Sequence, residues 1–103
     1  MDHTGERYWE AELYRLQGEF ILQQPVANEL RAESCFHQAL ALARRQHAKS
    51  LELRAAMSLA RLWQRQGKRA EARTLLTPLY GWFTEGFDTA DLQDARALVD
   101  ALA

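Results

Sequence analysis

The stretch AESCFHQA, residues 32–39, places Ala32, Phe36 and Ala39 at intervals of four and three. This spacing puts a small, a large and a small side chain on one face of a helix. The same intervals recur forty residues later, at Ala72, Leu76 and Leu79. The recurrence predicts a helical unit that the chain uses twice.

A second helix is expected upstream of each triplet. The two upstream helices each carry a small residue at corresponding positions. The first upstream helix carries Gly18 followed by Ile21, and the second carries Ala60 followed by Trp63. Small residues let two helices approach closely, while the aromatic residue fills the gap toward the neighbouring pair. The unit is therefore predicted to be a helical hairpin.

Composition and charge indicate one soluble helical domain. The 103 residues are 48% hydrophobic and 26% charged, with five Gly and two Pro, and strong helix formers fill most of the chain. A net charge of −1 removes the positive field that non-specific nucleic-acid binding requires. Neither a long apolar run nor a secretion signal is recognisable. We therefore expect a cytoplasmic protein without nucleic-acid or membrane partners.

Apolar periodicity predicts five helices with short connections. Pro25 is expected to end the first helix, Asn28 to cap the second and Gly67 to close the third. In the first helix one apolar stripe is formed by Trp9, Leu13, Leu16 and Phe20. The predicted units are repeat 1 at about 8–47, repeat 2 at about 50–80, a non-helical aromatic loop at 81–88 and a capping helix at 89–102.

These motifs resemble the tetratricopeptide repeat (TPR) family. The triplet Ala32, Phe36 and Ala39 matches the signature of the second TPR helix, and Leu59-Ala60 with Trp63 matches most of the first. The resemblance covers residues 8 to 80. It implies an all-α fold, a right-handed α-solenoid fragment with two hairpins and a C-terminal capping helix.

The chain also resembles the C-terminal repeat region of large bacterial signalling proteins. Those proteins join an adenylate or guanylate cyclase domain, or a transcription-regulator head, to an NTPase domain and a tail of such repeats. The resemblance is carried by residues 5–13 and by the tail YGWFTEGFDT, residues 80–89. Because this chain has no Gly-rich phosphate loop and no metal-binding aspartate pair, the resemblance implies a non-catalytic, regulatory part that needs no cofactor.

Basic residues are concentrated in residues 44–73. This segment contains nine Lys and Arg, and its acidic residues are Glu52 and Glu71. In TPR-like repeats the first helix of each hairpin lines the concave surface, which would present arginines to an acidic or C-terminal peptide. Alternatively, these arginines pair with acidic residues of the adjacent helices. The candidate groove residues are Glu12, Arg15, Glu19, Arg54, Met57, Ser58, Arg61, Gln64 and Arg65.

Two aromatic regions have alternative interpretations. Trp82, Phe83 and Phe87 could form a docking patch for a partner, but sealing the core beneath the last helix is the favoured role. On the first helix, self-association into a homodimer could cover a bare outer face. The residues expected on that face are Tyr8, Trp9, Tyr14 and Ile21.

An enzyme active site and a metal site are not expected. Cys35 is the single cysteine, and His37 lies two positions away, so the two side chains point in different directions on a helix. His3 and His47 have no companion ligands at metal-binding spacing. Two functions remain open: a module that binds a protein or peptide in its groove, and a structural capping or homo-oligomerisation domain without a ligand.

Overall fold

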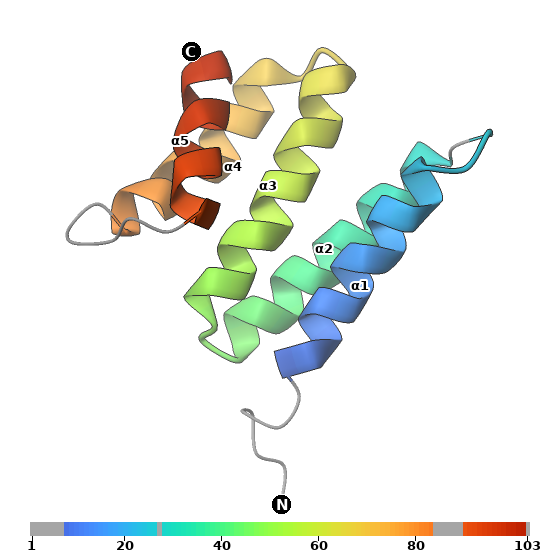
Figure 1. Cartoon of the computed structure of the whole chain (residues 1–103), viewed down its shortest axis with the longest axis horizontal. Coiled ribbons are helices and arrows are strands. Elements are labelled where there is room, and N and C mark those ends of the chain that lie inside the picture. The colour runs from blue at the N-terminus through green and yellow to red at the C-terminus, as the bar shows by residue number, and fades with distance from the viewer. Residues whose placement is uncertain (1–7, 27, 84–89, 103) are drawn as a thin grey trace, which may run out of the picture.

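The computed structural model describes residues 8–26, 28–83 and 90–102, and Figure 1 shows these parts of the chain as helices joined by short turns. The helices within those ranges are α1 (Tyr8–Leu22), α2 (Glu29–Arg45), α3 (Lys49–Arg65), α4 (Arg69–Trp82) and α5 (Ala90–Leu102). No strand occurs in the described ranges. The predicted all-α class with five helices is confirmed.

The turns that follow α2 and α3 are built alike. His47 after α2 and Gly67 after α3 both adopt positive φ angles, 55° and 81°. Each turn is closed by a backbone hydrogen bond, from Ala48 N–H to the Ala43 carbonyl at 2.9 Å and from Lys68 N–H to the Trp63 carbonyl at 2.8 Å. Left-handed residues at helix ends reverse the chain within a few residues. The two turns therefore send α3 and α4 back along their predecessors in the same way.

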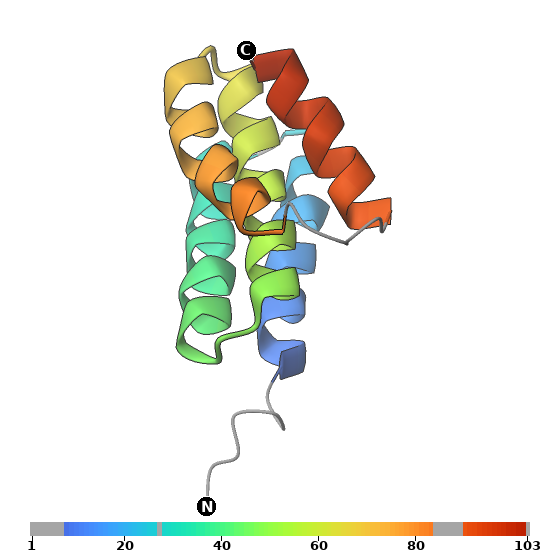
Figure 2. The same ribbon diagram turned by 90° about the vertical axis from the view of Figure 1, so that its left-hand side faces the viewer.

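The helices pack in order, each against the next, and α3 lies at the centre. In addition, α1 contacts α3 and α3 contacts α5, whereas α2 and α4 do not approach each other within the described residues. Figure 2 shows α2 and α4 on one side of α3 and α1 and α5 on the other. This alternation gives a repeat-like arrangement in which, among the described residues, α2 and α4 both pack against α3 but not against each other.

The repeated triplets form the core, as predicted. Ala32, Phe36 and Ala39 of α2 have no exposed surface. In α4, Ala72 and Leu76 are also fully buried, and Leu79 is 7% exposed. A Cβ atom added to Gly18 of α1 would lie 2.5 Å from Cε1 of Phe36. The small residue on the first helix therefore admits the aromatic ring of the second, which is the packing that the repeat pattern predicts.

Helix α4 is longer than expected, because it continues through Pro78 and ends at Trp82. The prediction of a loop from residue 81 is wrong for Gly81 and Trp82, and residues 84–88, including Phe87, lie outside the described part. Pro78 is exposed, so its ring meets solvent while the helix forgoes one backbone hydrogen bond. Phe83, directly after α4, is buried in the same cluster as Leu92 of α5, which is the sealing position predicted for it. Trp82 is 58% exposed, so the sealing role predicted for Trp82 is wrong.

Candidate functional site

The predicted groove residues on α1 and α3 form one polar network. Arg15 of α1 donates to both carboxylate oxygens of Glu12, from Nε at 2.8 Å and from Nη2 at 3.1 Å. Arg54 of α3 donates from Nη1 to Oε2 of the same carboxylate at 3.4 Å. Glu12 therefore joins the two helices by charge-assisted hydrogen bonds.

Ser58 of α3 provides a second connection to α1. Its side chain is 2% exposed, and its hydroxyl donates to Oε2 of Glu19 at 2.7 Å. The Oγ atom of Ser58 also accepts a hydrogen bond from Nη1 of Arg15 at 3.4 Å. A buried hydroxyl needs such partners, because an unsatisfied polar group is costly away from water.

The network also sets the protonation of its members. The hydrogen bond from Arg15 lowers the pKa of Glu12 below its ordinary value of 4.5, against the opposing effect of burial, and the charges of Arg15 and Arg54 lower it further. The hydrogen bond to Glu12 raises the pKa of Arg15. Both groups are therefore charged at neutral pH, and their charges are directed at each other.

The other predicted groove residues lie in different surroundings. Met57 is 4% exposed and belongs to the core, so its assignment to a groove surface is wrong: it lies on the side of α3 that packs against neighbouring helices. Arg65 forms an ion pair with Glu29 of α2 at 3.7 Å. Gln64 is half-buried. Arg61 is exposed and makes no ion pair with any residue that the structure describes.

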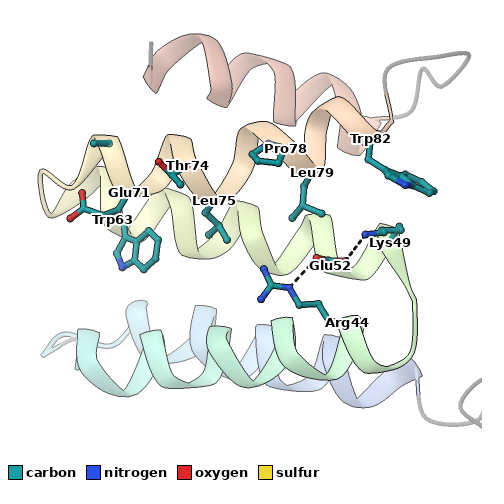
Figure 3. Close-up of a pocket in the computed structure, with 11 residues that line it drawn as sticks. Arg44, Lys49, Glu52, Trp63, Glu71, Thr74, Leu75, Pro78, Leu79 and Trp82 are labelled. Atoms are coloured by element: carbon teal, nitrogen blue, oxygen red, sulfur yellow. Dashed lines mark hydrogen bonds and ion pairs between the residues drawn. The ribbon is translucent and has the colours of Figure 1, made fainter.

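A hollow of about 760 Å³ lies between α2 and α4, with α3 as its floor (Figure 3). Sequence reasoning did not identify this site, because it arises between two helices that are not neighbours in the chain. Its lining residues are Arg44, Lys49, Glu52, Trp63, Ala70, Glu71, Thr74, Leu75, Pro78, Leu79 and Trp82.

One end of the hollow is charged. The carboxylate of Glu52, 5% exposed, accepts a hydrogen bond from Nε of Arg44 at 3.1 Å and pairs with Nζ of Lys49 at 3.4 Å. The Lys49 ammonium lies 5.5 Å from the centre of the Trp82 ring. Glu52 sits in the first turn of α3 and Arg44 in the last turn of α2, where the helix dipoles favour these charges.

The rest of the hollow is largely apolar. Leu75, Pro78 and Leu79 of α4 form one wall, and Trp63 of α3 lies toward the far end (Figure 3). The indole Nε1 of Trp63 is buried and has no hydrogen-bond partner among the described residues. Apolar walls combined with a few polar groups are typical of ligand and peptide sites.

The third surface is the outer α1 face, which we define as Trp9, Leu13, Leu16, Phe20 and Val26. These side chains are 59%, 45%, 52%, 63% and 89% exposed. The apolar stripe predicted on the first helix therefore faces solvent.

The residues predicted for this bare face are mostly elsewhere. Tyr14 and Ile21 are half-buried and pack against the two core clusters, so their assignment to the outer face is wrong. Tyr14 lies on the side of α1 that packs against the core, and Ile21 lies between that side and the second hollow described below. Trp9 is on the outer face, and the side chain of Tyr8 lies outside the described part.

A second hollow, of about 650 Å³, runs beside the outer α1 face. It lies between α1 and the first half of α2. Its lining residues are Leu13, Leu16, Gln17, Phe20, Ile21, Gln24, Val26, Asn28, Arg31 and Cys35.

Comparisons of the chain with protein-family models, with curated proteins and with solved structures gave no match. Across the described ranges, no group of three or more His, Cys, Asp and Glu side chains is placed to hold a metal ion. None of the described helices has the length and apolar character required to cross a bilayer. The candidate site therefore has to be judged from its own geometry.

Proposed function

We propose that this chain is a non-catalytic protein-interaction module, built as two TPR-like hairpins and a capping helix in a right-handed solenoid. The support is the contact pattern, in which α3 contacts both α1 and α5 while α2 and α4 stay apart within the described residues. Stacked helical hairpins have this arrangement, and such scaffolds bind protein segments on extended surfaces. The sequence resemblance adds the proposal of a regulatory part within a larger bacterial signalling protein.

The hollow between α2 and α4 carries this proposal, and its occupant is an amphipathic helical segment of another protein. From Glu71 to Trp82 the hollow follows α4 over a rise of about 16 Å, room for about three turns of a bound helix. Apolar side chains of that helix would lie against Leu75, Pro78 and Leu79, which is the helix-in-groove mode of recognition. Arg44 and Lys49 share the single carboxylate of Glu52, which leaves a net positive charge at this end of the hollow. Acidic side chains of the bound helix would lie against this end.

The α1–α3 surface is less suited to capture an acidic peptide. Arg15 and Arg54 are bonded to Glu12, and Arg65 is paired with Glu29. A bound carboxylate would have to displace these intramolecular partners, so little binding energy would remain. Within the basic region, the alternative interpretation of internal pairing accounts for Arg54 and Arg65, but not for Arg61.

The experiment selects helical peptides from a displayed library against the whole chain and measures their affinities for variants. Thr74→Arg places a long charged side chain in the hollow, whereas Thr77→Arg puts the same group on the same helix outside it. Both threonines are exposed, so neither change should disturb the fold.

We expect selected peptides with apolar residues at helical spacing and acidic residues at one end. Their affinity should fall at least tenfold with Thr74→Arg and should be unchanged with Thr77→Arg. Peptides that bind both variants equally, or that lose binding only with Arg61→Glu, would refute this site.

A second candidate function, homo-oligomerisation, is favoured by a different observation. The outer α1 face exposes five large apolar side chains, and contiguous apolar surface of this kind usually marks a contact with another protein.

A further inference from the structure

Four apolar side chains form one line along the exposed side of α1. Trp9, Leu13, Leu16 and Phe20 are separated by four, three and four positions. This spacing reads the same from either end, so the line has a centre between Leu13 and Leu16. A helix with such a line can pack antiparallel on an identical helix so that every apolar side chain of the line meets another.

The opposite side of α1 is apolar as well. Ala11 and Gly18 are buried, and Tyr14 and Ile21 pack against the core. A helix that is apolar on two opposite sides is usually covered on both. Among the described residues, α2 and α3 cover the inner side of α1 and leave the outer side exposed.

The borders of the line carry little charge that would oppose self-association. On the side of the second hollow, α1 and the turn after it contribute the neutral residues Gln17 and Gln24, and Arg31 of α2 also lines this hollow. On the other border, Glu12 and Glu19 are bonded to Arg15 and Ser58. A strongly charged partner would find little complementary charge on α1 along this line, whereas a second copy requires none.

The exposed area of the outer α1 face is close to the size of a standard dimer interface. From the exposed fractions, the outer α1 face presents on the order of 600 Å² per copy. A standard interface buries about 800 Å² per partner, including its polar rim. The apolar face together with its glutamine border approaches that size.

From these observations we propose that the chain forms a symmetric dimer in which α1 packs antiparallel on α1 of a second copy. Leu13 lies opposite Leu16 of the second copy, and Trp9 lies opposite Phe20 of the second copy. The hollow of about 650 Å³ adjoins Phe20, so it receives the indole of the second copy's Trp9 as an interface anchor. This dimer goes beyond the proposed peptide binding, because it uses a different surface.

The first experiment measures the mass of the whole chain by sedimentation velocity from 1 to 100 μM. We expect the wild type to approach twice the chain mass of 11.9 kDa. Leu16→Glu should raise the dissociation constant at least 100-fold, because it places a charge at the centre of the contact. Leu16 is 52% exposed, so the circular dichroism spectrum should remain that of the wild type.

The matched control is Trp82→Glu, since Trp82 is also a large apolar residue, 58% exposed, but lies on α4. This variant should dimerise like the wild type. A wild type that stays monomeric at 100 μM, or a dimer that Leu16→Glu leaves intact, would overturn the proposal. A monomer that binds a different protein through this face would overturn it equally.

A second experiment tests the antiparallel register by exchanging charges at the centre. Leu13→Glu combined with Leu16→Lys places opposite charges across an antiparallel contact, but like charges across a parallel one. The double variant should therefore dimerise at least tenfold more tightly than either single variant. If it dimerises no more tightly, the register is wrong.

Leu16→Glu should keep the affinity for selected peptides, so failure of the dimer and failure of the groove are separable.

Discussion

Phe36 of α2 packs so closely against Gly18 of α1 that a Cβ atom at position 18 would lie 2.5 Å from Cε1 and 2.8 Å from Cδ1 of the ring. Phe36 itself has no exposed surface. The separation of the first two helices is thus set by a missing side chain on one helix and a large ring on the other.

Gly18→Ala should destabilise the protein by about 1–3 kcal/mol, because the added methyl group must displace a ring in a closely packed core. The better helix propensity of alanine offsets up to about 1 kcal/mol of this loss. Gly81→Ala is the matched control, since no atom lies within 4 Å of its added Cβ, and it should stabilise by about 0.5–1 kcal/mol. Urea denaturation measures both. Equal effects of the two changes would contradict the close contact.

Combining Gly18→Ala with Phe36→Leu should cost less than the sum of the two single changes. The smaller leucine leaves room for the new methyl group, so the two sites should be coupled by about 1 kcal/mol or more. A double-mutant cycle of unfolding free energies gives this coupling. Strict additivity would mean that the two residues do not share the same space.

Ser58→Ala should destabilise by about 1–2 kcal/mol, because it removes the hydroxyl that donates to Glu19 and accepts from Arg15 in a buried position. Ser34 is the matched control: it lies exposed on α2, and Ser34→Ala should change stability by no more than about 0.5 kcal/mol. Thermal unfolding at pH 7 compares the two variants. A silent Ser58→Ala would show that the α1–α3 network adds nothing to stability.

The free energy of unfolding should fall at low pH, partly because Glu12 becomes protonated. Its pKa in the folded protein is below the ordinary 4.5, chiefly through the hydrogen bond from Arg15. A lowered pKa means that the contribution of Glu12 is complete above about pH 4.5 and is lost as the pH falls through the folded pKa. Glu12→Gln should therefore be less stable at pH 7 and should lose less stability between pH 5 and pH 3.

The measurement is the unfolding free energy against pH, with Glu71→Gln as the control. Glu71 is exposed and has no ion pair within the described ranges. That variant should follow the wild-type curve. If Glu12→Gln keeps the acid slope of the wild type, the Glu12 and Arg15 pair is not part of the acid transition.

Arg44→Ala should destabilise by about 1 kcal/mol, because it leaves the buried carboxylate of Glu52 with Lys49 alone. Arg45→Ala removes a neighbouring arginine in the same last turn of α2, and should be close to neutral since Arg45 is exposed. Both are measured by chemical denaturation at low salt. Equal losses would assign the effect to the helix end rather than to Glu52.

Much of the fold could be predicted from local patterns. The 4–3 spacing around Phe36 and Leu76 predicted which faces of α2 and α4 are buried, and Asn28 caps α2 through its side chain as expected. The prediction at Pro78 was wrong because its helix-breaking tendency is a local property. Burial of Leu79 and Phe83 in the core holds α4 together across Pro78.

The amino-acid sequence by itself determined five amphipathic helices, the small and large residues that let them interlock, and a basic central region, because periodicity and side-chain size act over a few residues. Only the tertiary structure decided which apolar side of α1 faces the core, which acids neutralise the arginines, and that a hollow lies between α2 and α4. Each of these depends on contacts between helices distant in the chain, and the distances that govern packing and charge pairing are set only when those helices meet.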